Sequence, residues 1–282
     1  MALVTSKDML LDAQKNGYAV GAFNIENMEM AQAVVDAAEE MRAPVILQTT
    51  PGTVKYADVD IYYAICAAMA KKVSVPVAVH LDHGNGFELA VQAVRAGYTS
   101  IMIDGSHESF EKNAEITGSV VAVAEPNGIP VEAELGRVGG KEDDLECAGG
   151  GYTDPIEARE FVDRTGVSSL AVGIGTAHGI YKGTPKLDIL RLKEIRKAVS
   201  VPLVLHGASG LSAGDISACI LEGICKVNFA TELRVAFSDG VKKVLAESPD
   251  VFDPKKYCAA GRENVKQLVM GRMKVCGCVN RF

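Results

Sequence analysis

The stretch VPVAVHLDHGN (residues 75–85) runs from an apolar segment directly into ionisable side chains. Residues 75–79 have the nearly continuous apolar character of a strand buried on both faces, and His80, Asp82 and His83 follow before Gly84. Seven other runs share this character, at residues 18–25, 43–50, 100–106, 129–136, 169–176, 201–208 and 225–231. The chain therefore contains eight candidate strands of a sheet that is covered on both sides.

Segments with the apolar spacing of an α-helix separate these runs, for example at residues 28–41, 87–96, 156–165, 189–199 and 216–221. Strands that alternate with helices pair in parallel through right-handed crossovers. Eight such units in 282 residues predict an α/β fold, the (β/α)8 TIM barrel. A doubly wound open sheet is the alternative, but AFNIENMEM (22–30) lacks the glycine-rich fingerprint of that fold.

The whole chain, 1–282, is predicted to be a single domain, because no low-complexity linker divides it. Its longest irregular segment, 137–154, contains five glycines and many charged residues, so we expect a mobile active-site loop there. A helical segment is expected at 254–278. The net charge of −7 argues against nucleic acid or an anionic membrane as the main partner.

The chain has no apolar run of 18 residues and no basic leader, so we expect a soluble protein in the cytoplasm. Its seven cysteines form no C-x-x-C pair, which is typical of reduced and mostly buried thiols rather than of disulfides or a thiolate metal site.

Polar residues gather where the predicted strands end. In a (β/α)8 barrel the carboxyl ends of the strands build the active site, so these residues are expected to share one rim. Besides those of 75–85, they are Asn24, Thr49, Thr50, Asp104, Glu132, Glu134, His178, His206, Asn228 and Thr231.

Four of the five histidines lie at or just after strand ends. A catalytic zinc takes three protein ligands and keeps an open position. We expect His83, His178 and His206 to be these ligands, because each precedes a glycine, and His80 to support them from within its strand. A single histidine of this kind is more often a hydrogen-bonded core residue, but three His-Gly steps at strand ends together favour a metal site.

The neighbouring carboxylates are candidates for proton transfer. Asp82, beside a predicted ligand, is interpreted as a general acid/base or as a group that orients the ligand. Asp104 and Glu134 are expected to hold a second metal or to brace the histidines. Glu132 is expected to point away from Glu134, out of the barrel centre.

A phosphate site is predicted at HGASGLSAGD (206–215) and VNFATEL (227–233), because the loops after the last two strands bind phosphate in many barrels. Ordinary helix capping is the alternative. Gly179 and Lys182 lie nearby in GIGTAHGIYKG (173–183). No lysine ends the run at 169–176, which argues against a Schiff base, although Lys182 remains a candidate. A metal, a phosphate site and a carboxylate base together indicate enolate chemistry.

Seven motifs resemble those of the class II, zinc-dependent ketose-bisphosphate aldolases along nearly the full length. They are AFNIEN, VHLDHG, MIDGSH, VEAELGRVGGKEDD, GIGTAHGIY, VPLVLHGASG and VNFATEL. The strings TPGT (50–53), GRVGGKEDD (136–144) and TDP (153–155) are most similar to the tagatose-bisphosphate branch.

The resemblance implies a role for each matching residue. The catalytic zinc would bind His83, His178 and His206, and Asp104 and Glu134 would surround a second metal position. Asp82 would exchange the proton of the C4 hydroxyl, and Glu142 would move the proton on the dihydroxyacetone phosphate carbon. The resemblance further implies a monovalent cation (Na+ or K+) near the phosphate and assembly into homodimers or homotetramers. Asn24 and Thr50 would belong to the substrate site, and the ketone-side phosphate would contact Gly179, Lys182, Gly207, Ser209, Asn228 and Thr231.

One position departs from the family pattern. Similar members carry an arginine two residues before a glycine in the C-terminal segment, where it reaches the phosphate of the aldehyde half. Here YCAAGREN (257–264) has Ala259 at that place, and Arg262 is the nearest substitute, with Lys255 or Lys256 as helpers. If none replaces it, the aldehyde carries another group.

The sequence thus predicts reversible, zinc-dependent aldol cleavage of a ketose 1,6-bisphosphate to dihydroxyacetone phosphate and glyceraldehyde 3-phosphate. Tagatose 1,6-bisphosphate is the favoured substrate, fructose 1,6-bisphosphate the second, and a differently substituted aldehyde the third. A zinc hydrolase on the same barrel is disfavoured. Such enzymes often have two histidines one residue apart on the first strand, whereas AFNIEN contains no histidine. A non-catalytic phosphosugar-binding protein would not need the proton-transfer carboxylates.

Overall fold

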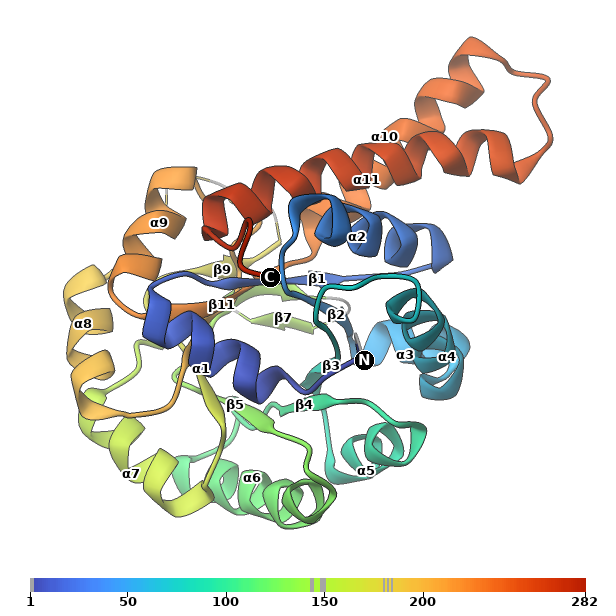
Figure 1. Cartoon of the computed structure of the whole chain (residues 1–282). Helices are drawn as coiled ribbons and strands as arrows, with labels where there is room; N and C mark the ends of the chain where they lie inside the picture. The colour runs from blue at the N-terminus through green and yellow to red at the C-terminus, as the bar shows by residue number, and fades with distance from the viewer. Residues whose placement is uncertain (1–2, 143–144, 148–150, 180, 182, 184) are drawn as a thin grey trace.

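Eight parallel strands close into a barrel in the computed structural model of the chain (Figure 1), which describes residues 3–142, 145–147, 151–179, 181, 183 and 185–282. Each strand overlaps one of the eight predicted runs, so the predicted (β/α)8 barrel is confirmed. In chain order the barrel strands are β1 (Val20–Asn24), β2 (Val45–Thr49), β3 (Val77–Gly84), β4 (Ser100–Ile103), β5 (Val131–Leu135), β8 (Ser169–Val172), β10 (Leu203–Leu205) and β11 (Ile224–Phe229).

Helices surround the barrel (Figure 1). The five helices expected from apolar spacing correspond to α2 (Met28–Met41), α5 (Phe87–Ala96), α7 (Pro155–Thr165), α8 (Ile189–Ala198) and α9 (Ala213–Leu221). The segment expected at 254–278 corresponds to α11 (Pro254–Cys276). The remaining α-helices are α1 (Ser6–Asn16), α3 (Pro51–Ala57), α4 (Val59–Ala70), α6 (Phe110–Ala124) and α10 (Thr231–Glu247).

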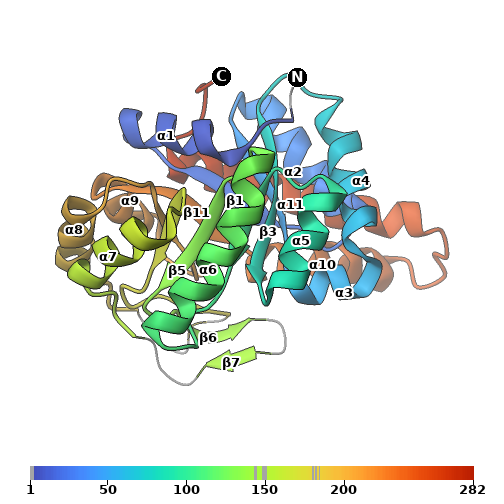
Figure 2. The ribbon, with the colours of Figure 1, turned by 90° about the horizontal axis from the view of Figure 1, so that it is seen from below.

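The two ends of the barrel are covered differently. Helix α1 lies across the amino end, where Ser6 Oγ and Ser100 Oγ are 2.8 Å apart. The strands β6 (Gly139–Glu142) and β7 (Leu145–Cys147) lie at the opposite end (Figure 2). Helices α10 and α11 pack against each other and their far ends project beyond the barrel (Figure 1). Among the described residues, no helix has the length and hydropathy needed to span a bilayer.

The segment predicted to be an irregular loop, 137–154, contains regular structure. β6 (Gly139–Glu142) pairs antiparallel with β7 (Leu145–Cys147) and parallel with β9 (Ala177–His178), so that part of the prediction was wrong. The sequence analysis missed strand β6 because the segment has five glycines, and glycine is rare in sheets except where another backbone approaches closely. A Cβ on Gly140 would lie 2.2 Å from the His178 carbonyl oxygen. The mobility of the segment stays a prediction.

A β-bulge ends β3. The pairing with β4 advances from Leu81 opposite Ile101 to Gly84 opposite Ile103, so β3 contains one extra residue. His83 has a φ of 49°, in the left-handed region that a non-glycine residue adopts infrequently. A bulge re-aims the side chains around it. Asp82 and His83, which a regular strand would send to opposite faces, therefore both serve the same end of the barrel.

Gly84 permits this close approach to β4. A Cβ at this position would lie 2.5 Å from the Met102 carbonyl oxygen. We expect Gly84→Ala to lower the free energy of unfolding by about 1–3 kcal/mol, because the backbone must shift to admit the methyl group. In Gly118→Ala on α6 the added Cβ meets nothing within 4 Å, so this control should be neutral or stabilising by up to about 1 kcal/mol. Equal stabilities in urea denaturation would contradict this account of the bulge.

Candidate active site

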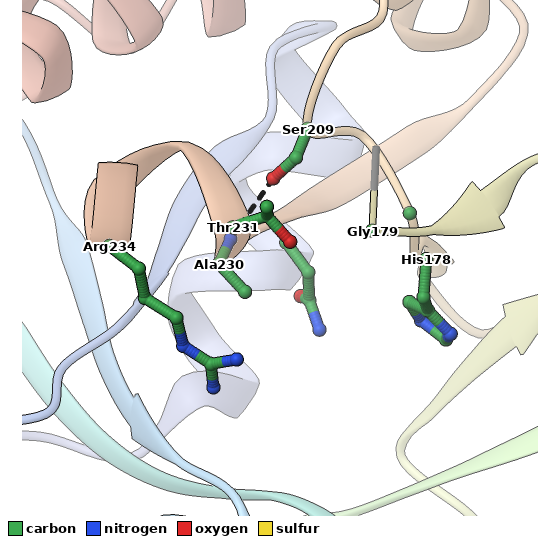
Figure 3. Close-up of a pocket in the computed structure, with 8 residues that line it drawn as sticks. His178, Gly179, Ser209, Ala230, Thr231 and Arg234 are labelled. Carbon is green, nitrogen blue, oxygen red and sulfur yellow. Dashed lines mark hydrogen bonds between the residues drawn. The ribbon is translucent and has the colours of Figure 1, made fainter. Parts of the chain in front are cut away.

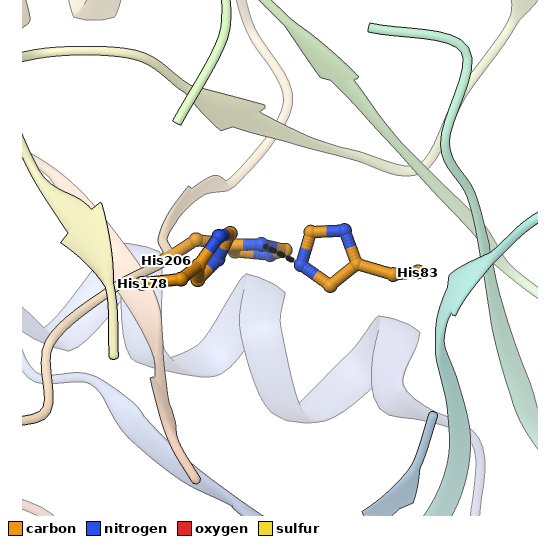
Figure 4. Close-up of side chains that lie close together, drawn as sticks. All are labelled: His83, His178 and His206. Carbon is orange, nitrogen blue, oxygen red and sulfur yellow. Dashed lines mark hydrogen bonds between the residues drawn. The ribbon is translucent and has the colours of Figure 1, made fainter. Parts of the chain in front are cut away.

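Three histidine side chains from separate segments meet at the carboxyl end of the barrel (Figure 4). His83 is the penultimate residue of β3, His178 lies in β9, and His206 follows directly after β10. The ring centroid of His83 lies 4.9 Å from that of His178 and 4.6 Å from that of His206, and the third pair is 6.0 Å apart. The three residues predicted to bind a metal are therefore neighbours in space.

Carboxylates behind two of these rings determine which ring nitrogens face the cluster. His83 Nδ1 lies 2.7 Å from Asp104 Oδ2, and His206 Nε2 lies 3.0 Å from Glu132 Oε1. An ionised carboxylate only accepts hydrogen bonds, so these two nitrogens carry protons. The other nitrogens, His83 Nε2 and His206 Nδ1, face each other at 2.9 Å. The contact is drawn as a hydrogen bond in Figure 4, so one proton, or a metal cation in its place, can join the two rings.

Glu134 adds a further potential ligand. Its Oε2 atom lies 3.6 Å from His206 Nδ1, is buried, and has no hydrogen-bond partner within the described part of the chain. Burial, assisted by the charge of Asp104, raises the pKa of Glu134, and a bound cation would oppose this effect. Ligand atoms lie within 4.8 Å of one another in two groups, His83 with His178 and His206, and His83 with Asp104 and Glu134. Imidazole nitrogens with carboxylate oxygens suit a divalent cation such as zinc.

Asp82 lies in the same end of the barrel and is held by three amide groups. Asn24 Nδ2 and Gln48 Nε2 donate hydrogen bonds to Oδ2 at 2.8 Å and 3.2 Å, and Asn228 Nδ2 donates to Oδ1 at 2.9 Å. The donors come from β1, β2 and β11, so three strands fix the orientation of this buried carboxylate. Neutral donors on both oxygens orient the group without neutralising it, as a general base requires.

A pocket lies beside the histidines (Figure 3). Ser209 Oγ accepts a hydrogen bond of 3.2 Å from the Ala230 N–H, which joins the loop after β10 to the start of α10. All of the predicted phosphate ligands line the pocket except Lys182, which lies outside the described residues. The lining consists of His178, Gly179, Gly207, Ser209, Asn228, Ala230, Thr231 and Arg234.

The other predicted site residues lie elsewhere or are not described. Thr50 is buried and caps α3, where its Oγ1 accepts a hydrogen bond of 3.2 Å from the Thr53 N–H. Glu142 ends β6, but its side chain lies outside the described part of the structure. Arg262 lies on α11, where it donates a hydrogen bond of 3.1 Å to Gln32 of α2.

The expectation for Glu132 was wrong. Residues two positions apart on a strand share a face, so Glu132 and Glu134 both point into the barrel, and both are buried there. Burial opposes ionisation of Glu132, but the ammonium of Lys226, aided by the His206 hydrogen bond, outweighs it and lowers the pKa of Glu132. Lys226 Nζ lies 3.0 Å from the carboxylate and is itself completely buried.

His80 extends this buried network toward the amino end of the barrel. Its Nδ1 lies 2.7 Å from Ser100 Oγ, and its Nε2 lies 3.5 Å from Lys226 Nζ. Burial, reinforced by the charge of Lys226, lowers the pKa of His80 well below its usual value, so the ring is neutral at pH 7. His80 therefore supports the site through Lys226 and Glu132.

Three residues of the site escaped the sequence analysis. Gln48 and Lys226 each interrupt an apolar strand run, in VILQTT and CKVNF, and a polar residue inside a buried strand was the signal available for both. Arg234 follows VNFATEL by one position and had no such signal. Its Nε donates a hydrogen bond of 2.6 Å to Glu26, which also accepts one of 2.8 Å from Thr53.

The closed barrel, with histidines and carboxylates gathered at its carboxyl end, defines the protein as a barrel enzyme. The family model for class II fructose-bisphosphate aldolases matches residues 4–281, and the chain belongs to this family. The protein is therefore an aldolase, a carbon–carbon lyase.

Solved structures of aldolases resemble the whole chain. The YdjI aldolase from Escherichia coli K12 is 38% identical, with a TM-score of 0.88 and coverage of 99% of both chains. A candidate fructose-1,6-bisphosphate aldolase from Coccidioides immitis is 32% identical over 97% of this chain and 96% of its own, with a TM-score of 0.89. The fructose-bisphosphate aldolase of Campylobacter jejuni, at 24% identity, covers 100% of this chain and 97% of its own, and its TM-score of 0.83 supports the fold alone.

Replacing Lys226 with methionine would leave the Glu132 carboxylate buried without its cation. We expect the free energy of unfolding at neutral pH to fall by about 3–5 kcal/mol, as measured by urea denaturation. The double variant Glu132→Gln/Lys226→Met removes both charges and should recover most of this loss, because a packed neutral pair of similar volume often costs little. A Lys226→Met protein as stable as the wild type would contradict the prediction.

Proposed function

We propose that this aldolase catalyses the reversible, zinc-dependent cleavage of a ketose 1,6-bisphosphate to dihydroxyacetone phosphate and glyceraldehyde 3-phosphate. The observation that carries the proposal is the approach of His83 Nε2 to His206 Nδ1 at 2.9 Å, with the other nitrogen of each ring against a carboxylate. In a tetrahedral zinc site with Zn–N bonds of about 2.05 Å, two ligand nitrogens are roughly 3.3 Å apart, so a small adjustment accommodates the ion. His178 would complete a set of three histidine ligands, which would leave one ligand position of the zinc open.

When bound, zinc supplies Lewis-acid polarisation of the ketose carbonyl. Asp82 accepts the proton of the C4 hydroxyl as the bond between C3 and C4 breaks, and that hydroxyl becomes the aldehyde. The three amide donors aim the carboxylate and keep it from rotating toward the histidines. Glu142 delivers the proton to the dihydroxyacetone phosphate carbon, a role that stays a prediction because its side chain is not described.

The phosphate of the ketone half is assigned to the pocket of Figure 3. Gly207 lines this pocket, and its φ of 66° with a Cβ contact of 2.6 Å to the Ala177 carbonyl oxygen favours glycine where the loop after β10 packs against β9. Helix α10 begins at Thr231 without a side-chain cap, and the N-terminus of a helix favours an anion. The contributions of Lys182 and of a monovalent cation remain predictions.

Arg234, on the opposite side of this pocket from His178, is a second candidate beside Arg262 for the anion on the aldehyde half. Arg262 donates to Gln32 on the flank of the barrel, whereas Arg234 lines the pocket and is held by Glu26. Figure 3 shows Arg234 on one side of Ala230 and Thr231 and His178 on the other. A guanidinium at this place would replace the arginine that the family pattern has at the position of Ala259.

Tagatose 1,6-bisphosphate is the favoured substrate because three sequence strings resemble that branch. Fructose 1,6-bisphosphate and a ketose with a differently substituted aldehyde half are the alternatives. Family membership argues against the non-catalytic phosphosugar-binding protein. A cytoplasmic location and assembly into homodimers or homotetramers stay predictions.

The function is tested by measuring cleavage of tagatose 1,6-bisphosphate, fructose 1,6-bisphosphate and a ketose 1-phosphate by zinc-loaded protein, with and without chelator. We expect cleavage of a bisphosphate that the chelator abolishes and zinc restores. Cleavage of the 1-phosphate alone would keep the reaction and change the aldehyde. Undiminished activity in excess chelator would refute zinc dependence.

His83→Ala should remove bound zinc and activity together, because His83 belongs to both candidate ligand groups. Metal analysis after gel filtration and the cleavage assay measure the two effects. His107→Ala, on the loop after β4, is the matched control and should retain both. Stoichiometric zinc with normal turnover in the His83 variant would refute its assignment as a ligand.

Glu142→Ala should slow exchange of the dihydroxyacetone phosphate proton with solvent deuterium by at least about 100-fold while zinc stays bound, because general acid–base groups contribute about 10²–10⁴-fold. Proton NMR of dihydroxyacetone phosphate in deuterium oxide follows the exchange. Glu146→Ala, in the neighbouring strand β7, serves as the control. An unchanged exchange rate in the Glu142 variant would exclude it as the base.

Arg234→Gln should raise the KM of the bisphosphate about 10-fold or more, because a charged hydrogen bond contributes about 1.5–3 kcal/mol, and should change the KM of the ketose 1-phosphate much less. Arg262→Gln is the matched control and should leave both values unchanged. The reverse pattern in steady-state kinetics would return the role to Arg262.

A further inference from the structure

Glu132 lies behind His206, on the side of the ring that faces away from the other two histidines. We propose that Glu132 is a positioning residue that holds the His206 proton on Nε2, and thereby presents Nδ1 to the metal. The inference rests on the proposed zinc site. Glu132 then acts through His206 and does not itself contact the metal or the substrate.

The geometry of His206 separates its two nitrogens. Nε2 lies 3.0 Å from Glu132 Oε1, whereas Nδ1 lies 2.9 Å from His83 Nε2 and 3.6 Å from Glu134 Oε2. Only Nδ1 therefore faces the ligand cluster. A neutral imidazole has one protonated nitrogen, and a hydrogen bond from that N–H fixes both the tautomer and the ring orientation. His206 is completely buried, so water does not compete for Nε2.

Lys226 gives Glu132 the charge state that this function needs. Its Nζ lies 3.0 Å from each carboxylate oxygen of Glu132, which keeps the group an acceptor toward His206. The contact crosses the inside of the barrel, because β10 and β8 separate β11 from β5 in the sheet. Lys226, Glu132 and His206 are each at most 2% exposed, so this pairing is sealed from solvent.

Glu132 differs in this respect from Asp104, the carboxylate behind His83. Asp104 contacts His83 Nδ1 and also belongs to a group of possible ligands with His83 and Glu134. Glu132 is absent from both ligand groups found among the described residues. Its effect on the metal therefore passes through His206 alone, which makes it separable from metal ligation by experiment.

The variant Glu132→Gln tests the proposal. A glutamine side chain can turn its amide N–H toward Nε2, which moves the His206 proton to Nδ1 and blocks the ligand position. We expect the zinc dissociation constant, measured by competition with a chromophoric chelator, to rise about 10- to 100-fold. Long-range ¹H–¹⁵N NMR of the metal-free proteins should show His206 as the Nε2–H tautomer in the wild type and a growing Nδ1–H population in the variant.

Ser100→Ala is the matched control. It removes the hydrogen bond of Ser100 to His80 in the same buried network but leaves Glu132 and His206 in contact. Its zinc affinity should stay within about twofold of the wild type, because Ser100 contacts neither Glu132 nor His206 and reaches them only through His80 and Lys226. If Glu132→Gln does not fold, Glu132→Gln/Lys226→Met, which has no unpaired charge, should show the same loss of affinity and the same tautomer shift.

Wild-type zinc affinity and an unchanged His206 tautomer in the Glu132 variants would overturn the inference while leaving the zinc site in place. Equal losses of affinity in Ser100→Ala would also overturn it, because the effect would then follow core stability. A wild-type protein that binds no zinc would overturn the proposed function and this inference together. Loss of affinity with a shifted tautomer, and a normal Ser100→Ala protein, would support it.

Discussion

The site depends on the bulge at the end of β3. One extra residue between Leu81 and Gly84 turns the strand so that Asp82 and His83, adjacent in the chain, serve one site. Asp82 meets amides from three strands, and His83 meets His206 and Asp104. A regular strand would have sent one of the two side chains out of the barrel. The residues proposed for proton transfer and for metal ligation are thus neighbours because of a local irregularity, which the close approach at Gly84 permits.

The inside of the barrel contributes charge as well as packing. Lys226 and Glu132 form an ion pair where TIM barrels ordinarily place branched apolar residues. Such a pair is costly to bury and adds little stability relative to an apolar pair of the same volume. Its position directly behind His206 explains why it is worth that cost, since an ionised acceptor there orients a ligand of the proposed zinc site.

The pocket beside the histidines bears on which substrate the protein would bind. Backbone at Gly207 and the first turn of α10 suit a phosphate of the ketone half, a feature expected for any aldolase of this reaction type. Arg234 adds a cation to this pocket in a protein of net charge −7, which suits the binding of an anionic group there. Tagatose and fructose differ in configuration at C4, the carbon whose hydroxyl Asp82 is proposed to deprotonate.

The sequence alone determined the barrel and the order of its strands and helices, because alternating apolar runs and amphipathic helices are local patterns, and α2 and α5 begin and end where spacing placed them. It also brought His83, His178 and His206 to one rim, since parallel strands share their carboxyl ends. It misplaced Glu132 and passed over Gln48, Lys226 and Arg234. Only the tertiary structure decided those positions, because contacts in the closed barrel join residues 146 to 208 positions apart in the chain.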